Sequence, residues 1–398
     1  MFMDRRGVFR KTRLMELFHA TAMTLDIPQG RREEAADRYD GVARWLSEGD
    51  HPFLRNLRLY LQGSVALGTV VKPLGVAEFD VDLVCLLLAA SLGIAPAEVK
   101  RIIGDRLRAS GIYAPLLEEM PRCWRLNYAD RFHLDITPSV RNPDCPNGGE
   151  LVPDKALRQW KPSNPSGYRS DFEARASLTL RIRVTKSFDE AAGLRADIEP
   201  FPVHASEKGM LRVIVQVTKR HRDVHVDRHG IDLSLAPISV IVTTLLALSY
   251  SALAGTTFDT EYDALVAVVR GMTDFIRHEV VDGRLVWFIM NPATQGENFA
   301  EKWNRKPGRA KAFFEWHASV LADLEALGQA EGLDQVRRRM EGMFGPRPIG
   351  KVFAAMDAEL AAARRTGTLS VAPGVGLTTV TTPLLGATPV RSNTFYGS

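Results

Sequence analysis

Three aspartates in two short segments have the residue types and the spacing to hold divalent cations. Asp80 and Asp82 alternate with apolar residues at the start of a strongly apolar segment, and Asp135 lies in a second such segment. Two carboxylates one residue apart on a strand project from the same face, and a third on a neighbouring strand completes a set of oxygen ligands that suits magnesium. Two such ions activate an attacking hydroxyl and neutralise a leaving pyrophosphate, so these segments favour nucleotidyl transfer.

A turn of small residues precedes the first aspartate pair. Gln62, Gly63 and Ser64 follow a predicted strand, where glycine lets the backbone approach a phosphate and a serine hydroxyl donates to its oxygens. A Gly-Ser pair or an Asp-X-Asp motif alone is more often a turn or a solvated strand end. The order along the chain of a strand, this turn, the aspartate pair and the later aspartate is what favours a catalytic phosphate site.

The segments around these residues have the periodicity of a protein with both helices and strands. The predicted strands are Leu57 to Leu61, Phe79 to Leu88, Arg122 to Tyr128 and Arg131 to Thr137. One or two helices within Arg5 to Glu48 are expected to pack across the back of a sheet. The other predicted helices are Pro96 to Ala109, Lys208 to Arg222, Pro237 to Ala252, Asp263 to His278, Glu297 to Leu327 and Gly350 to Arg365. Arg141 to Gly167 is rich in Pro, Asn and Gly and is expected to be a long ordered loop or a crossing between lobes.

Composition restricts the class of protein. The chain has 398 residues, 45% of them hydrophobic, which is enough for a large core or for two joined lobes. Its formal net charge of +4 suits anionic ligands but falls well short of a protein that coats nucleic acid. The three cysteines indicate neither a disulfide framework nor a zinc ribbon. Because no apolar stretch is long enough to span a bilayer and the N-terminus does not resemble a signal peptide, we expect a soluble cytoplasmic protein.

Longer strings around the candidate residues resemble one enzyme family. The run QGSVALGTVVKPLGVAEFDVDLVCLL, residues 62–87, is similar to the SMODS-type nucleotidyltransferases of the anti-phage systems called CBASS, which are relatives of cGAS and oligoadenylate synthetase. The strings FHLDITPSV, DKALRQWKPSNPSGY, VTKRHRD, APISVIVTTLLALSY and NPATQGENFAEKW resemble segments of that family in the same order. The resemblance to these cGAS/DncV-like enzymes, the CD-NTases, thus covers residues 62–303.

The resemblance implies an α+β fold with two lobes, a polymerase-beta-like nucleotidyltransferase core with a mixed sheet and a C-terminal helical lobe. Residues 1–200 are expected to form the core lobe with its N-terminal helices, and residues 201–365 the helical lobe that completes the active-site cleft. Residues 366–398 contain Thr, Gly, Pro, Val and Ser with almost no charge, which predicts a flexible tail.

The resemblance also assigns roles to individual residues. Gly63 and Ser64, preceded by Gln62, match the family's phosphate-binding turn. The positions that match its catalytic, metal-binding triad are Asp80, Asp82 and Asp135, for which Mg²⁺ or Mn²⁺ is the expected cofactor.

Four further residues are candidates for nucleotide contacts. Lys219 matches a lysine that contacts the donor triphosphate, and Ser239 matches a serine in a similar role, although their ordinary interpretations are a solvated helix end and a helix-start hydroxyl. Asn164 and Asn298 have amides that can read nucleobase edges. Asn164 beside Pro165 is equally a turn residue, and Asn298 is equally a helix cap.

The function implied by the resemblance is synthesis of a cyclic dinucleotide or trinucleotide from ATP, GTP or other nucleoside triphosphates. The product would be a second messenger that activates a separate effector in anti-phage defence. One alternative is a template-independent nucleotidyltransferase acting on RNA or another acceptor, and another is a catalytically silent nucleotide-sensing adaptor. Clustered carboxylates are costly to retain without a cation, which disfavours the adaptor. The chain lacks the zinc insertion of animal cGAS, so DNA sensing is not expected.

The C-terminal residues favour one further partner. A tail that ends in Phe395, Tyr396, Gly397 and Ser398 resembles the termini of family members that a ubiquitin-transfer-like enzyme conjugates to targets. A small-residue terminus can thread into an adenylating active site, whereas the ordinary interpretation is a frayed terminus. We therefore expect conjugation through this tail.

Overall fold

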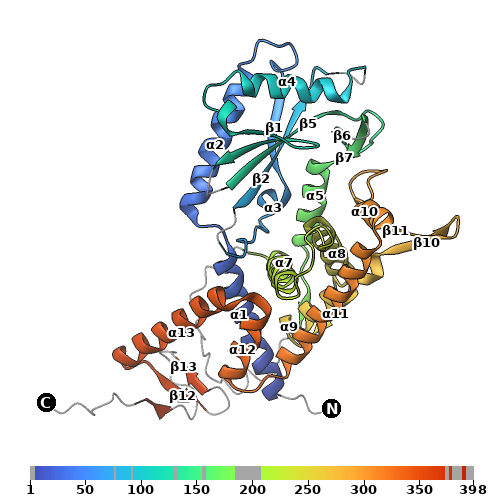
Figure 1. Ribbon diagram of the computed structural model, residues 1–398. Helices are drawn as coiled ribbons and strands as arrows, with labels where there is room; N and C mark the ends of the chain where they lie inside the picture. The colour runs from blue at the N-terminus through green and yellow to red at the C-terminus, as the bar shows by residue number, and fades with distance from the viewer. Residues whose placement is uncertain are drawn as a thin grey trace.

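The chain folds into two lobes around a cleft, one built on a mixed β-sheet and one helical (Figure 1). The computed structural model describes residues 5–75, 78–90, 93–128, 132–154, 158–183, 208–372, 376–378 and 388–390. The predicted α+β architecture with two lobes is therefore confirmed. The predicted lobe boundary at residue 200 lies outside the described residues and stays a prediction.

The sheet is centred on the two strands that carry the aspartates. Five strands lie in the order β1-β2-β5-β4-β3, with β6 paired to the end of β5 and β7 paired to β6. The strands β2 and β5 run parallel, and the other neighbouring pairs are antiparallel. The bounds are β1 Leu57–Gln62, β2 Phe79–Leu87, β3 Leu117–Glu119, β4 Trp124–Tyr128, β5 Phe132–Arg141, β6 Glu150–Asp154 and β7 Gln159–Ser163.

One face of this sheet is apolar and is covered by two helices, α2 (Gln29–Ser47) and α4 (Pro96–Arg108). Val81, Leu83 and Cys85 alternate along β2 on this face and are buried, as are Leu134 and Ile136 of β5. Because successive side chains of a strand point to opposite faces, burying these residues directs the intervening polar residues toward the cleft.

Gly104 in α4 marks where this packing is closest. A Cβ atom at Gly104 would lie 2.2 Å from the Trp124 indole. We expect Gly104→Ala to destabilise the protein by about 1–3 kcal/mol, because overpacking outweighs the better helix propensity of alanine. The matched control is Gly350→Ala in another helix, where a Cβ would meet nothing within 4 Å. This control should be neutral or stabilising in urea denaturation, and equal effects of the two substitutions would contradict the packing argument.

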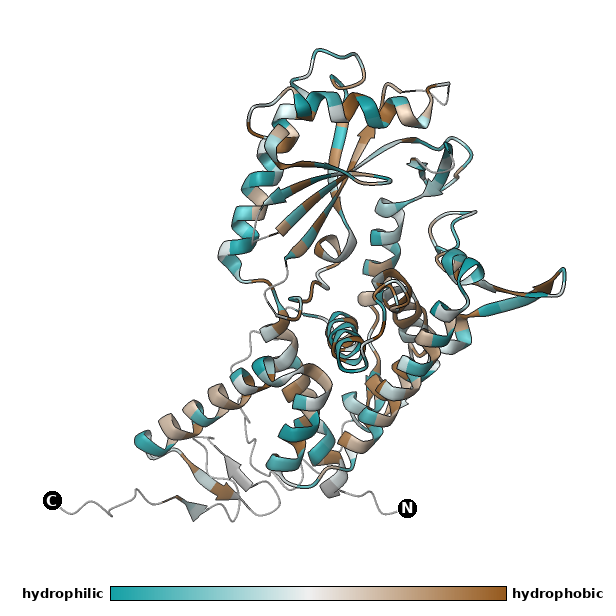
Figure 2. Ribbon diagram, in the orientation of Figure 1, coloured by the Kyte–Doolittle hydropathy of each residue, from teal (hydrophilic) through white to brown (hydrophobic). Residues whose placement is uncertain are grey.

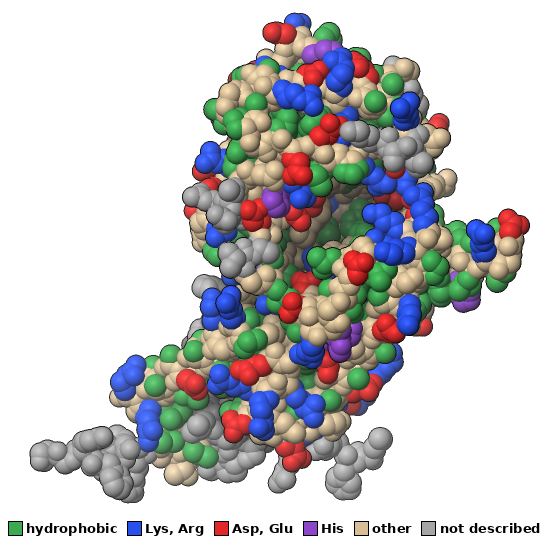
Figure 3. Space-filling view, in the orientation of Figure 1, with side chains coloured by type: hydrophobic (Ala, Val, Ile, Leu, Met, Phe, Trp, Pro, Cys, Tyr) green, Lys and Arg blue, Asp and Glu red, His purple; other side chains and the backbone are tan. Residues whose placement is uncertain are grey.

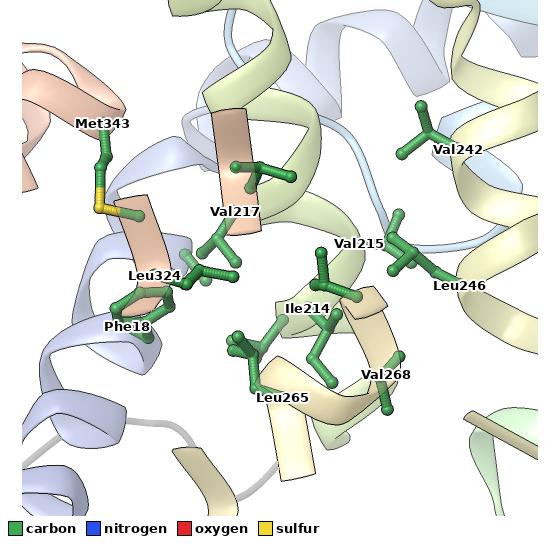
Figure 4. Close-up of a cluster of buried hydrophobic side chains, with 14 of the residues drawn as sticks. Phe18, Ile214, Val215, Val217, Val242, Leu246, Leu265, Val268, Leu324 and Met343 are labelled. Carbon is green, nitrogen blue, oxygen red and sulfur yellow. The ribbon is translucent and has the colours of Figure 1, made fainter. Parts of the chain in front are cut away.

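The helical lobe is assembled around α7 (Met210–Arg228), whose buried side chains pack against its neighbours (Figure 4). Its neighbour α8 is apolar along most of its length, whereas α2 exposes a polar side (Figure 2). The other elements are α8 Ser239–Ala252, α9 Glu261–Arg270, η3 Gly271–Phe275, α10 Glu301–Arg305, α11 Gly308–Gly328, α12 Leu333–Phe344 and α13 Pro346–Thr366.

The first helix, α1 (Arg5–Leu25), packs into the helical lobe and not across the back of the sheet, which corrects the prediction for this helix. Phe18 is fully buried, with its ring centroid 5.8 Å from that of Tyr262 and 5.3 Å from that of Phe344. Only the second predicted helix, α2, covers the sheet. Both helices have an amphipathic pattern, and the pattern does not specify which apolar surface each one meets.

The segment predicted to link the lobes contains the β6–β7 hairpin and the start of α5 (Pro165–Ala176). Lys161 on β7 forms an ion pair with Glu301 on α10, so the hairpin is tied to the helical lobe. A second hairpin projects from that lobe (Figure 1). The remaining short elements are α3 Gly63–Ala66, η1 Ala114–Leu116, β8 Arg181–Ile182, β9 Thr257–Phe258, β10 Arg277–Val281 and β11 Arg284–Phe288.

Part of the predicted flexible tail is ordered. Three short strands form an antiparallel sheet, β12 (Ser370–Ala372) between β13 (Gly376–Thr378) and β14 (Thr388–Pro389). Leu369 before this sheet is buried. The predicted conjugation residues Phe395 to Ser398 lie outside the described residues. No helix in the described part of the chain is long and apolar enough to cross a membrane.

Candidate functional site

The two central strands bring the three aspartates to one face of the sheet. In the parallel pairing of β2 with β5, Asp82 lies opposite Asp135 and Asp80 lies opposite His133. Arg125 of β4 lies opposite Asp135 on the other side. The apolar residues between them are buried under α2 and α4, so a rigid packed layer supports the carboxylates.

Gly63 closes over Asp82 at the end of β1. Its φ of +65° lies in the left-handed region, and a Cβ at this position would lie 2.3 Å from Asp82 Oδ2. Only glycine accommodates both the conformation and the close approach. The predicted turn residue Gln62 pairs with Asp82 in the β1–β2 register, and Ser64 lines the cleft.

The opposite wall of the cleft comes from the helical lobe. The cleft has a volume of about 870 Å³, and Ser64 and Asp80 line it from the sheet lobe. Lys219 and Ser239 line it from α7 and α8. Figure 3 shows the hollow between the lobes, with acidic side chains on its left rim and Lys and Arg side chains on its right rim. The structure thus gathers predicted residues from both lobes around one cavity.

Lys219 joins the two walls. It is buried, and its Nζ donates a hydrogen bond to the Thr69 backbone oxygen at 2.9 Å, just beyond the Gly63 turn. Burial lowers the pKa of Lys219 to about 8, the nearby Arg222 adds to this effect, and Asp223 and Asp82 oppose it. The position provides a positive charge at the floor of the cleft with little competing water.

The carboxylates repel one another in the absence of a cation. Burial, followed by the charges of Asp135 and Asp80, raises the pKa of Asp82 to about 7, although Arg125 opposes the shift. Burial also raises the pKa of Asp80. Crowded carboxylates of this kind gain most from a divalent ion that neutralises them.

The donor set fits a hard divalent cation, because its three side chains offer carboxylate oxygens alone. Among the residues that the structure describes, no three His, Cys, Asp or Glu side chains are already arranged as a metal site. Both oxygens of Asp135 accept hydrogen bonds from the Arg125 guanidinium, at 2.7 Å each. Asp80, Asp82 and Asp135 are therefore the residues that would hold Mg²⁺ or Mn²⁺.

Comparison with known proteins shows what the chain is similar to. Residues 14–175 match the model of the Second Messenger Oligonucleotide or Dinucleotide Synthetase domain, SMODS. A c-di-GMP synthase from Roseivirga ehrenbergii is 28% identical over 393 residues, which cover 97% of this chain and 98% of the relative. The cyclic dinucleotide synthase CdnG from Bradyrhizobium diazoefficiens is 25% identical, over 85% of this chain and 82% of the relative. The chain thus contains a SMODS domain at residues 14–175 and is similar over most of its length to these two synthases.

Solved structures of CD-NTases share the fold. The structure of Bradyrhizobium diazoefficiens CdnG in complex with GTP superposes with a TM-score of 0.65 at 22% identity, over 87% of this chain and 99% of that chain. The GTP-bound form of Vibrio cholerae DncV superposes with a TM-score of 0.52 at 14% identity, over 87% of this chain and 91% of that chain. At these identities the likeness shows the fold alone, and it agrees with the bilobed architecture of this chain.

Both asparagine amides that were candidates for base contacts have backbone partners in the structure. Asn164 is buried, caps α5 by accepting from the Gly167 amide, and donates to the Ala293 backbone oxygen at 2.9 Å. Asn298 donates to the Trp287 backbone oxygen and accepts from two backbone amides. Because these amides hold loops in place, we leave both residues out of the proposed nucleotide site.

Two arginines at the site were not predicted from the sequence. Arg125 was not singled out because its contact depends on the pairing of β4 with β5, which spacing does not specify. Arg222 lines the cleft and donates to the Ser239 hydroxyl at 2.9 Å. Its position three residues after Lys219, on the same side of a helix, was an available signal.

Proposed function

We propose that this protein is a cyclic dinucleotide synthase that joins two GTP molecules and releases pyrophosphate at each of two steps. The observation that carries the proposal is the set of Asp80, Asp82 and Asp135 on two paired strands, where Gly63 lies against Asp82 and Asp80 lines the same cleft as Lys219. The relative named a c-di-GMP synthase, which aligns over nearly the whole chain, supports GTP as the substrate. Cyclic di-GMP is the expected product.

Divalent ions on the three aspartates would supply the activation of the acceptor hydroxyl and the neutralisation of the leaving pyrophosphate. The chain itself positions the nucleotides. The glycine at position 63 lets the backbone approach a triphosphate, and the Ser64 hydroxyl donates to its oxygens. Lys219 adds a buried positive charge that strengthens phosphate binding.

The shape of the cleft suits a reaction between two bound nucleotides. Its volume of about 870 Å³ is at the upper end of the range for small-molecule sites, which leaves room for a donor and an acceptor together. Holding both reactants in one site replaces a bimolecular encounter with an oriented, effectively unimolecular step. The same advantage favours closure of the linear intermediate while it stays bound.

The test is to incubate the purified protein with ATP, GTP, CTP and UTP, together and singly, with Mg²⁺ or Mn²⁺. Products are treated with phosphatase and identified by mass spectrometry. We expect GTP alone to give a phosphatase-resistant cyclic dinucleotide. Linear chains would instead support a template-independent nucleotidyltransferase, and a cyclic product of other bases would retain the synthase but overturn the assignment to GTP.

The lowered pKa of Lys219 makes nucleotide binding depend on pH. Below about pH 8 the amine is protonated, and above it the nucleotide-free protein loses this positive charge. We expect the affinity for a non-hydrolysable GTP analogue, measured by calorimetry, to fall as the pH rises from 7 to about 9.5. Lys219→Met should weaken binding about tenfold at pH 7 and flatten this pH dependence.

Lys208→Met is the matched control for this pH dependence. Lys208 lies just before α7 and is also partly buried. It pairs with Asp26 and does not line the cleft. This variant should keep the wild-type affinity and pH profile. An unchanged profile in Lys219→Met would show that another group titrates.

A signalling role completes the proposal. The match of residues 14–175 to the SMODS model supports a product that acts as a second messenger, and we expect it to activate a separate effector protein in anti-phage defence. Deleting residues 392–398 tests the predicted conjugation tail. Synthesis by the purified enzyme should be kept while any covalent adduct in cells is lost, and loss of synthesis would show that the tail belongs to the catalytic fold.

A further inference from the structure

Arg125 holds a position among the catalytic carboxylates for which the proposed reaction gives no role. Its Nε lies 2.7 Å from Asp135 Oδ1, and its Nη2 lies 2.7 Å from Asp135 Oδ2. This two-pronged contact fixes the orientation of the carboxylate and is the strongest geometry for an arginine–carboxylate pair. The pair is also shielded, with 22% of the Arg125 side chain and 13% of the Asp135 side chain exposed.

The same guanidinium reaches the first aspartate pair. Arg125 Nη2 lies 3.6 Å from Asp80 Oδ1, so one cation bridges strands β2 and β5 across the site. The neighbouring His133 is engaged with Glu78 at 2.6 Å. Of the cations in the described part of the chain, Arg125 is the one whose ion pairs join Asp80 to Asp135.

A bound divalent ion and the Arg125 guanidinium would compete for the carboxylate oxygens of Asp135. Metal coordination uses the carboxylate oxygens to which Arg125 donates, and an ion bound between Asp80 and Asp135 would lie close to a fixed positive charge. Like charges that lie close together repel strongly in a partly buried site. Metal binding therefore requires Arg125 to give up part of its contact.

We propose that Arg125 is an internal counter-cation that positions Asp135 in the metal-free enzyme and weakens the binding of free metal, so that metal binds well only together with a nucleotide. The nucleotide triphosphate supplies a second anion for the guanidinium and so compensates for the contact that the metal displaces. The proposal rests on the assignment of Asp80, Asp82 and Asp135 as metal ligands in the proposed function.

The thermodynamic consequence is positive coupling between metal and nucleotide. If the nucleotide relieves the competition at Asp135, it raises the affinity for metal, and metal raises the affinity for the nucleotide by the same factor. Removing Arg125 should strengthen metal binding in the absence of nucleotide and should reduce this coupling. A residue that only supports the fold would change neither quantity in this direction.

The experiment measures Mn²⁺ binding to the full-length protein by electron paramagnetic resonance, without turnover, with and without a non-hydrolysable GTP analogue. Arg125→Gln should bind free Mn²⁺ about tenfold more tightly than the wild type, and the analogue should raise its affinity less than it raises that of the wild type. Arg125→Lys keeps the positive charge but cannot donate to both Asp135 oxygens in the same two-pronged geometry. It should give a Mn²⁺ affinity and a coupling between those of the wild type and Arg125→Gln.

The matched control is Arg122→Gln, which removes the same charge three residues away, where Arg122 pairs with Asp154 at 3.1 Å. This control should bind Mn²⁺ as the wild type does. The proposal is wrong if Arg125→Gln binds free Mn²⁺ no more tightly than Arg122→Gln. If Arg125→Gln does not fold, Arg125→Lys provides the test. The proposal is then wrong if Arg125→Lys has the Mn²⁺ affinity of the wild type and the same coupling between Mn²⁺ and the GTP analogue.

Two further results separate this inference from the proposed function. A wild-type protein that makes the cyclic product while Arg125→Gln shows unchanged Mn²⁺ affinity would overturn the role of Arg125 and leave the synthase standing. An Asp82→Asn variant that binds Mn²⁺ as tightly as the wild type would overturn the metal assignment, and the inference with it.

Discussion

The Gly63→Ala variant should lose cyclic dinucleotide synthesis while the protein remains folded. We expect a decrease in kcat/KM of about 100-fold or more, because an ångström-scale displacement of the catalytic groups is enough to cause such a loss. The added Cβ would lie 2.3 Å from Asp82 Oδ2, so the carboxylate or the turn has to move. The φ of +65° adds a cost of about 1–2 kcal/mol for a residue with a side chain.

The control separates this contact from backbone strain. Gly255 also has a positive φ, +85°, but a Cβ there would meet nothing within 4 Å. Gly255→Ala should lose similar stability in thermal denaturation and keep wild-type kcat/KM, measured by quantifying the cyclic product. If both variants retain synthesis, the close contact between Gly63 and Asp82 is not needed for catalysis. If both lose it equally, general destabilisation explains the result.

The strands that carry the site were predictable because their two faces differ in chemistry. The predicted strand Phe79 to Leu88 is observed as Phe79–Leu87, and the predicted strand Leu57 to Leu61 as Leu57–Gln62. Buried apolar residues on one face and carboxylates on the other produce an alternation of apolar and acidic residues, which can be recognised in the sequence. The pairing of Asp82 with Asp135 in the parallel strands was not predictable from spacing, because a connection of 44 residues separates β2 from β5.

Two predicted helices differ from the structure at local signals in the sequence. The predicted helix Asp263 to His278 ends early, at Arg270, and a 3-10 turn and the first strand of the β10–β11 hairpin follow it. The Asp282-Gly283 pair, both with positive φ, was a hairpin signal in the sequence. In the segment Glu297 to Leu327, Pro307 and Gly308 interrupt the helical pattern of the sequence, and the structure divides it there into α10 and α11, as expected where proline interrupts backbone hydrogen bonding.

The position of α1 illustrates a different limit. Its apolar stripe predicted a helix, and α1 is indeed helical from Arg5 to Leu25. The stripe packs against α7, α9 and α13 and not against the sheet, because the helical lobe would otherwise expose its core. Periodicity indicates that a face is buried, whereas the complementary surface is chosen by the whole fold.

The Asp82→Asn variant should lose catalysis and gain stability in the absence of metal. Synthesis should decrease by at least about 1000-fold, because a metal ligand that contributes several kcal/mol to the transition state is removed. The near-isosteric amide also removes a charge that burial disfavours and that Asp135 and Asp80 repel, and these effects together raise the pKa of Asp82 to about 7. We therefore expect the melting temperature in EDTA to rise by about 2 °C or more at pH 8.

The combination of these two effects distinguishes a ligand-binding carboxylate from a structural one. Asp26 provides the contrast, since it accepts from Lys208 at 2.5 Å and from Gln216 at 2.8 Å. Asp26→Asn should lower the melting temperature, because it weakens favourable contacts. Added Mg²⁺ should stabilise the wild type and not Asp82→Asn, since a ligand stabilises only the state that binds it. An Asp82→Asn variant that keeps synthesis, or that melts lower than the wild type in EDTA, would place the metal outside this carboxylate cluster.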